Sequence, residues 1–133
     1  MADMLTETDV SKLALAKKYA HDLGVLLQEH KGKDVVVMDL CEMKTWTDFF
    51  IIATASSNTH LDGLERHIKE FCAGNDLELL RRSRRPAGED DEWRLLDLGT
   101  IVVHLMSERL REFYELERLY PPPLARYLSL NSK

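Results

Sequence analysis

Apolar positions recur along this chain with two different periods, and they divide it into predicted helices and strands. Apolar residues three and four apart predict a first helix over about 10–30, capped by Thr8 or Asp9. A β-branched run predicts a strand over 34–40, and a nearly continuous apolar run predicts another over 49–55. The remaining predictions are a helix from the 56–59 cap to about 72, an exposed strand over 77–80, a charged loop over 81–91, hairpin strands over 92–98 and 101–105, and a closing helix that ends before the prolines at 121–123.

The predicted hairpin carries an unusual acid. Gly99 offers the positive φ that a tight reversal needs. Asp97 lies within an otherwise apolar hairpin, so it is either a satisfied structural group or part of a surface that meets another molecule. Because side chains alternate along a strand, Trp93, Leu95 and Asp97 are predicted to share one face, and Arg94, Leu96 and Leu98 the other.

The order of elements predicts the fold class. Helix, two strands, helix, three strands and helix indicate one α/β (α+β) domain with a mixed five-stranded sheet flanked by helices. The link over 41–48 is too short for a helical crossover, so the first two strands should be antiparallel. We expect a flexible start over 1–8, the domain over 9–120 and a proline-led tail over 121–133.

Composition narrows the class of protein. The chain has 133 residues, of which 44% are hydrophobic and 31% charged, as in globular domains. Its net charge of −5 argues against nucleic acid as the main partner. Cys41 and Cys72 are too few for a disulfide framework, and the N-terminus has no apolar signal segment. No apolar run approaches the roughly 20 residues of a membrane helix, so we expect a cytoplasmic protein that does not enter membranes.

The sequence gives little indication of a catalytic site or a metal site. The strand-to-helix turn over 54–58 has no glycines to cradle a phosphate. Ser56 or Ser57 could meet His60, but helix capping explains these serines more simply. His60 and His67 are seven residues apart, too far to share one metal ion. No cofactor and no metal are therefore expected.

Three alternatives remain open from the residues alone. Asp39 and Asp48 could form a metal-binding pair for nucleotidyl transfer, although the glycine-serine turn of such enzymes is missing. The basic cluster Arg81–Arg85 is either a solvated loop balanced by the acids at 89–92 or a contact to a phosphate backbone, as in an RNA-binding module. Trp93 either packs on a helix or contacts a partner, because aromatic side chains dominate protein interfaces.

Four sequence motifs occur in order along the chain. They are DVVVMDL over 34–40, TDFFIIAT over 47–54 leading to Ser57 and His60, WRLLDLG over 93–99 with VVH over 102–104, and REFYELERLY over 111–120. With these motifs the chain resembles the ribosomal silencing factor family, also called Iojap-like proteins, over about residues 8–120. It departs from the family pattern at Ala55, where a glycine is usual, and at Tyr120, where a tryptophan is usual.

The resemblance implies both a fold and a function. It implies a nucleotidyltransferase-like topology without catalytic residues, hence a non-enzymatic protein. It also implies binding to the large ribosomal subunit through its protein fourteen, which blocks joining of the small subunit and slows translation when nutrients are scarce. Several family members form homodimers in isolation, and a minor ribosomal RNA contact through Arg81–Arg85 fits this picture. By position in the motifs, the contact residues are Trp93, Leu95, Asp97, Leu98 and His104.

Overall fold

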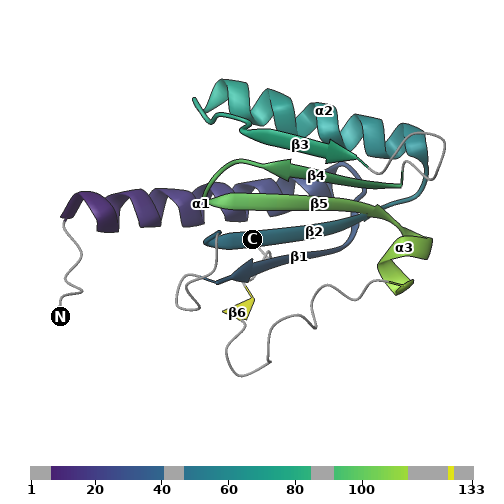
Figure 1. Ribbon diagram of the computed structural model, residues 1–133, viewed down its shortest axis with the longest axis horizontal. Helices are drawn as coiled ribbons and strands as arrows, with labels where there is room; N and C mark the ends of the chain where they lie inside the picture. The colour runs from purple at the N-terminus through teal and green to yellow at the C-terminus, as the bar shows by residue number, and fades with distance from the viewer. Residues whose placement is uncertain (1–6, 41–46, 85–91, 114–125, 128–133) are drawn as a thin grey trace.

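The chain folds into a single α+β domain with a mixed sheet. A computed structural model describes residues 7–40, 47–84, 92–113 and 126–127, which form three helices and six strands (Figure 1). In chain order these are α1 (Glu7–Glu29), β1 (Lys33–Asp39), β2 (Phe49–Ala55), α2 (Asn58–Gly74), β3 (Arg81–Arg84), β4 (Trp93–Asp97), β5 (Ile101–Ser107), α3 (Glu108–Phe113) and β6 (Arg126–Tyr127).

The sheet has the strand order β3-β4-β5-β2-β1-β6. β2 and β5 pair in parallel at its centre, with Phe49 opposite Ile101 and Ala55 opposite Ser107. The other neighbouring pairs are antiparallel, including β1 with β2. The predicted mixed sheet and its antiparallel first pair are therefore confirmed.

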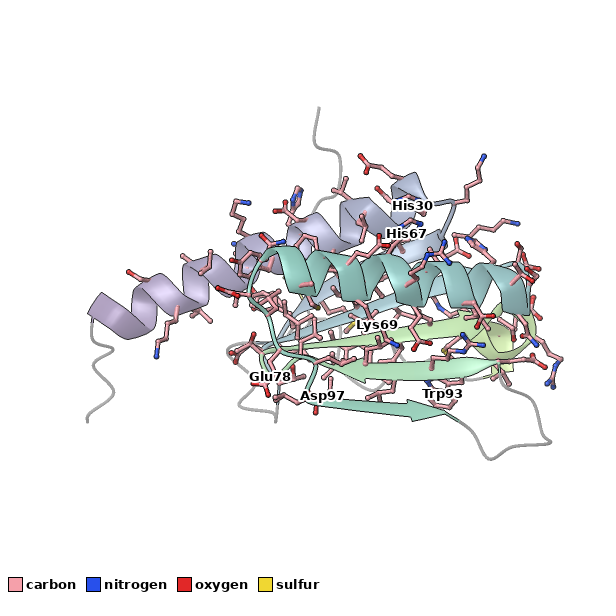
Figure 2. The ribbon with its side chains drawn as sticks, turned by 90° about the horizontal axis from the view of Figure 1, so that it is seen from above. His30, His67, Lys69, Glu78, Trp93 and Asp97 are labelled. Carbon is pink, nitrogen blue, oxygen red and sulfur yellow. The ribbon has the colours of Figure 1, made fainter. Side chains whose placement is uncertain are left out.

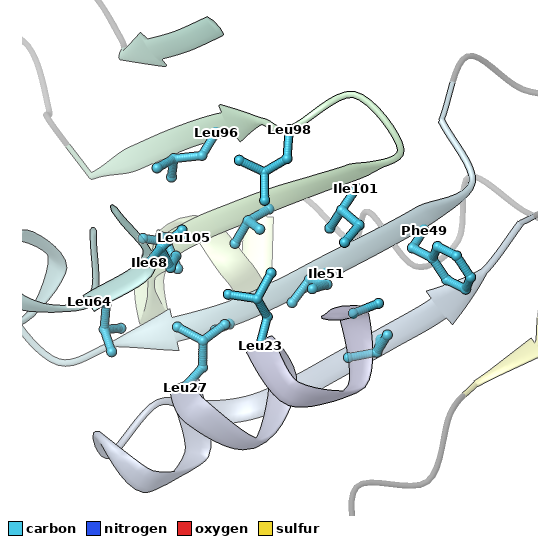
Figure 3. Close-up of a cluster of buried hydrophobic side chains, with 14 of the residues drawn as sticks. Leu23, Leu27, Phe49, Ile51, Leu64, Ile68, Leu96, Leu98, Ile101 and Leu105 are labelled. Atoms are coloured by element: carbon cyan, nitrogen blue, oxygen red, sulfur yellow. The ribbon is translucent and has the colours of Figure 1, made fainter. Parts of the chain in front are cut away.

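Both long helices cover the same face of the sheet. Their apolar stripes pack on β-branched and leucine side chains of the central strands, so that face is closed to solvent (Figure 3). The buried residues are Ala16, Ala20, Leu23 and Leu27 of α1, Leu61, Leu64, Ile68 and Cys72 of α2, and Val37, Phe49, Ile51, Ala53, Ala55, Leu96, Leu98, Ile101, Val103 and Leu105 of the sheet region.

The opposite face carries a smaller apolar cluster. The short helix α3 begins after Ser107, whose hydroxyl caps it by accepting a hydrogen bond from the Leu110 N–H at 3.2 Å. Leu110 packs on this face, and the Arg111 guanidinium donates to the Thr54 hydroxyl at 2.8 Å. α3 therefore covers part of this face. The buried members of the cluster are Met38, Leu40, Phe50, Ile52, Met106 and Leu110.

Three details of the predicted elements are wrong, namely the position of one strand, the number of strands and the cap of the first helix. The strand expected over 77–80 lies instead at β3, within the expected charged loop, because Leu77 and Leu79 pack against the core and pairing with β4 starts only at Arg81. The sheet has six strands rather than five, since residues 126–127 of the expected tail pair with β1 and two residues carry no periodic signal. Thr8 and Asp9 cannot cap the first helix, because α1 begins at Glu7.

Some predictions fall on residues outside the described ranges. The predicted closing helix extends past α3, and its positions 114–120 are not among the described residues. The same holds for Cys41 and for Arg85 at the end of the basic cluster. Cys72 is buried, as expected for a small apolar side chain, and this burial raises the pKa of its thiol.

Candidate functional site

Strand β4 presents three neighbouring side chains on the face that α1 and α2 leave open. Trp93, Leu95 and Asp97 are half-buried, whereas the residues between them are buried, so the predicted alternation is confirmed. In the view from above, α1 and α2 lie together to one side of the strands, with Trp93 and Asp97 labelled towards the two ends of β4 (Figure 2). We call Trp93, Leu95 and Asp97 the β4 face.

Trp93 is held by a hydrogen bond to His104 on the neighbouring strand. The indole Nε1 donates to the His104 Nδ1 at 3.0 Å. Because an indole N–H can only donate, Nδ1 must be the unprotonated nitrogen of the imidazole. His104 is therefore neutral in this arrangement, with its hydrogen on Nε2.

His104 also contacts Phe50 of β2, and the three side chains form a row across the sheet. The Phe50 and His104 ring centroids lie 4.6 Å apart, and those of Trp93 and His104 lie 5.9 Å apart. Both contacts are within the range in which ring pairs attract each other. We call Trp93, His104 and Phe50 the aromatic row. It links the β4 face to the buried centre of the sheet.

The environment of His104 disfavours its charged form. The residue is only 5% exposed. Its burial lowers the pKa of the imidazole from 6.5 to about 4. The low pKa agrees with the acceptor role of Nδ1. His104 therefore belongs to the site as a buried neighbour of Trp93 rather than as an exposed contact residue.

Asp97 has a structural role in the hairpin. Its Oδ1 accepts a hydrogen bond from the Gly99 N–H at 2.9 Å, and Gly99 adopts a φ of 92°. The Asp97 backbone carbonyl accepts from the Leu80 N–H at 2.8 Å. Leu80 is 56% exposed, and its Cδ1 lies 3.4 Å from the position that a Cβ at Gly99 would take, so an exposed apolar side chain lies beside the hairpin turn. The sequence contains no pattern that distinguishes Leu80 from Leu77 and Leu79, so it was not among the predicted contact residues.

Leu98 does not lie on the β4 face. It is only 7% exposed and belongs to the core beneath the helices, together with Leu96. Leu98 is five, three and one positions from Trp93, Leu95 and Asp97, and because each of these numbers is odd, alternation along the chain places Leu98 on the opposite face. The structure therefore places Leu98 in the core rather than on the β4 face, and its contact with a partner stays a prediction.

A buried charge network on the helix-covered side was not predicted. The Arg94 side chain is 2% exposed and contacts the carboxylates of Asp62 and Glu65 on α2. Glu65 also lies 3.2 Å from the Lys69 ammonium. Glu65 lies next to Leu64 and three positions before Ile68, both of which face inward from α2. This position on the apolar side of the helix could have predicted that the acid is buried. The network joins β4 to α2.

The serine and histidine residues at the start of α2 act as caps and connectors. The Ser57 hydroxyl accepts from the His60 N–H at 3.0 Å, which confirms the predicted capping role. The His60 Nδ1 accepts from the Ser56 N–H at 2.9 Å, and its Nε2 donates to the His30 carbonyl at 2.8 Å. His30 and His67 stack with ring centroids 3.6 Å apart, where the end of α1 meets α2 (Figure 2). These contacts join the two helices.

The two candidate carboxylates lie at one end of the β1–β2 pair. Asp39 is opposite Phe49, the neighbour of Asp48 in the chain. Partial burial, followed by the charge of Asp39, raises the pKa of Asp48. Among the described residues, no group of three or more histidine, cysteine, aspartate or glutamate side chains is arranged to hold a metal ion. Within the same ranges, no helix has the length and apolar character needed to cross a membrane.

The sequence of this chain matches a known protein family over most of its length. A family model described as "Ribosomal silencing factor during starvation" matches residues 13–130. Ribosomal silencing factor RsfS of Treponema pallidum is 38% identical over 94 residues, which are 71% of this chain and 82% of the relative. The protein Iojap, chloroplastic, of Zea mays is 31% identical over 102 residues, 77% of this chain and 43% of that protein.

A mouse relative is named for an assembly function. The Mus musculus protein "Mitochondrial assembly of ribosomal large subunit protein 1" is 27% identical over 107 residues, 80% of this chain. The chain spans 47% of that protein's length, so it matches only part of it.

Solved structures share the fold. A crystal structure from Bacillus halodurans superposes with a TM-score of 0.65 at 24% identity, covering 86% of this chain and 99% of the other. A crystal structure of a Chromobacterium violaceum protein also gives a TM-score of 0.65 at 24% identity, covering 87% and 92%. At this identity the two structures support the fold only.

Proposed function

Because the chain belongs to the ribosomal silencing factor family, whose function is regulatory rather than enzymatic, we propose that it represses translation by binding the large ribosomal subunit. The proposed docking partner is the subunit's protein fourteen. While it is bound, the domain occupies space that the small subunit needs, so joined ribosomes do not form. Repression under nutrient limitation fits the family description, which refers to starvation.

The observation that carries this proposal is the position of the β4 face. Trp93 is a large aromatic side chain on the face that α1 and α2 do not cover, and Leu95 and Asp97 extend the same surface. Large aromatic side chains next to a few polar groups carry most of the energy in protein interfaces. The mouse relative, by its name, acts in large-subunit assembly, which supports a large-subunit partner here.

A minor proposal concerns ribosomal RNA. β3 runs along one edge of the sheet, next to β4, and we propose that its basic segment, residues 81–84, contacts ribosomal RNA near the β4 face. Such a contact should weaken steeply as the salt concentration rises.

A second minor proposal concerns the free protein. In the absence of ribosomes, the apolar part of the β4 face favours a homodimer, because an open apolar surface is stabilised by self-association. Sedimentation velocity of the free protein tests this second point.

The direct test of function uses purified subunits. Large and small subunits are mixed at a magnesium concentration that promotes joining, with increasing amounts of the protein, and are separated by sedimentation. We expect joined ribosomes to decrease and the protein to migrate with the large subunit. If joined ribosomes form undiminished at saturating protein, the proposed function is wrong. Binding to isolated protein fourteen in a pull-down then tests the proposed partner separately.

A further inference from the structure

We infer that His104 is a positioning residue, which holds the Trp93 indole in the orientation that meets the partner. The identity of the partner rests on the proposed function, whereas the contacts themselves lie within the sheet. His104 is too buried to contribute much contact surface of its own. Of the two side chains that it contacts in the aromatic row, Phe50 is buried and Trp93 is half-buried, so an effect of His104 on binding must pass through Trp93.

Strand register explains why these two residues meet. Trp93 is opposite Met106 across the β4–β5 pair, and His104 is opposite Leu95. Trp93 and His104 are therefore diagonal neighbours on one face, a separation that aromatic side chains can bridge. The 3.0 Å hydrogen bond from the indole Nε1 to Nδ1 spans this diagonal. It fixes the rotation of the indole, because the donor has a single direction.

The imidazole is itself fixed from the other side. His104 is opposite Ile52 on β2, and Phe50, two residues away on the same strand, contacts its ring at 4.6 Å. Phe50 and Ile52 are both buried. The aromatic row thus crosses β4, β5 and β2, including the parallel pair at the centre of the sheet. A tightly packed interior resists side-chain rotation, so the support for the indole is rigid.

A fixed indole binds more tightly than a mobile one. Ordering a mobile side chain during association costs affinity, and for one aromatic residue the loss corresponds to about two- to twelvefold in Kd. In this protein the indole is already ordered when the domain folds, so its ordering does not reduce the affinity for the partner. Removing the acceptor at Nδ1 should therefore weaken binding about fivefold, although the atoms removed touch no partner.

Three substitutions separate this role from simple packing. His104→Asn keeps an acceptor close to the position of Nδ1, His104→Gln moves the acceptor further out, and His104→Leu removes it. Each is made in a Trp46→Phe background, so that Trp93 is the single tryptophan of the two in the chain. Hydrogen exchange of the indole N–H, followed by NMR, reports the hydrogen bond. Co-sedimentation with large ribosomal subunits reports Kd.

We expect slow indole exchange and near-unchanged Kd, within about twofold, for His104→Asn. For His104→Gln and His104→Leu we expect exchange at least about tenfold faster and binding about fivefold weaker. If His104→Leu does not fold, the Asn and Gln pair decides the question, since both keep a polar side chain.

Two results would overturn the inference. One is equal binding by the Asn and Gln variants, which would mean that the acceptor position does not matter. The other is an indole N–H that exchanges in the unsubstituted protein as fast as in free tryptophan, which would mean that the hydrogen bond is absent in solution. If the unsubstituted protein fails to bind large subunits at all, the proposed function is wrong, and a positioning role towards that partner is wrong with it.

Discussion

The Arg94 guanidinium on β4 lies 3.3 Å from the Glu65 carboxylate on α2, and both side chains are almost completely buried. Arg94 is the neighbour of Trp93 in the chain, but it points to the opposite face of the sheet. The ion pair therefore attaches the inner side of β4 to a helix, while the outer side carries the β4 face. The β4 face, which we propose as the docking surface, therefore lies on the strand that this internal contact attaches to α2.

Replacing Arg94 by alanine should destabilise the fold by about 3 kcal/mol or more, because a buried carboxylate loses its guanidinium partner. Urea unfolding monitored by circular dichroism measures the change. Lys69→Ala is the matched control, because Lys69 pairs with the same carboxylate from an exposed position and should cost less than about 1 kcal/mol. Equal effects of the two substitutions would contradict a special role for the buried pair.

The elements and their faces could be predicted where the apolar period was long. The stripe from Ala16 to Leu27 and the alternation of Trp93, Leu95 and Asp97 led to the correct helix and the correct strand face. β6 could not be predicted, because two residues contain no period. Its pairing depends on contacts with β1, far away in the chain.

The candidate site was predicted in part. The hairpin motif pointed to Trp93 and Asp97, and alternation already placed Leu98 on the other face. The contact between His104 and Trp93 depends on strand register, which a single sequence does not contain. The Arg94–Glu65 pair joins residues 29 positions apart, and such pairing emerges only when β4 packs under α2. Tertiary contacts, rather than local propensity, determine these parts of the site.

Stability should depend on pH through His104. Burial keeps its pKa at about 4 in the folded protein, against an ordinary value of 6.5. As the pH falls below 6.5 the unfolded chain takes up a proton that the folded protein does not, so stability is full above 6.5 and decreases towards pH 4. Between pH 7 and pH 5 this loss should amount to about 2 kcal/mol.

Urea unfolding at both pH values, on the unsubstituted protein and on His104→Asn, isolates the contribution of this one group. The asparagine variant lacks the imidazole. Between pH 7 and pH 5, its free energy of unfolding should therefore decrease by about 2 kcal/mol less than that of the unsubstituted protein. Parallel pH profiles for the two proteins would show that His104 is not the group responsible.

Asp97 should affect the turn and the docking surface separately. Asp97→Asn retains an oxygen for the Gly99 N–H, so its stability should stay within about 0.5 kcal/mol, whereas Asp97→Ala should lose about 1 kcal/mol. If the negative charge contributes to docking, both variants bind large subunits more weakly and with less dependence on salt. Thermal unfolding and co-sedimentation at two salt concentrations measure these effects. Unchanged binding by Asp97→Asn would show that the negative charge of Asp97 does not contribute to docking.

Leu80 should contribute to docking because it is an exposed apolar side chain beside the hairpin turn that follows β4. Leu80→Ser should weaken binding to large subunits about fivefold while leaving stability nearly unchanged, since the side chain is already in solvent. Leu15→Ser is the matched control, because Leu15 is 48% exposed on α1, remote from the β4 face. Equal binding by the two serine variants would place Leu80 outside the interface.

The most direct measurement of the central claim is the affinity of Trp93→Ala for purified large ribosomal subunits, with circular dichroism to verify the fold. Loss of a large aromatic side chain from the centre of an interface costs about 2 kcal/mol or more, so we expect binding at least about thirtyfold weaker than for the unsubstituted protein. Leu15→Ser, measured in parallel, should bind normally. A folded Trp93→Ala protein that co-sediments with large subunits as well as the unsubstituted protein would contradict the claim that the β4 face is the docking surface.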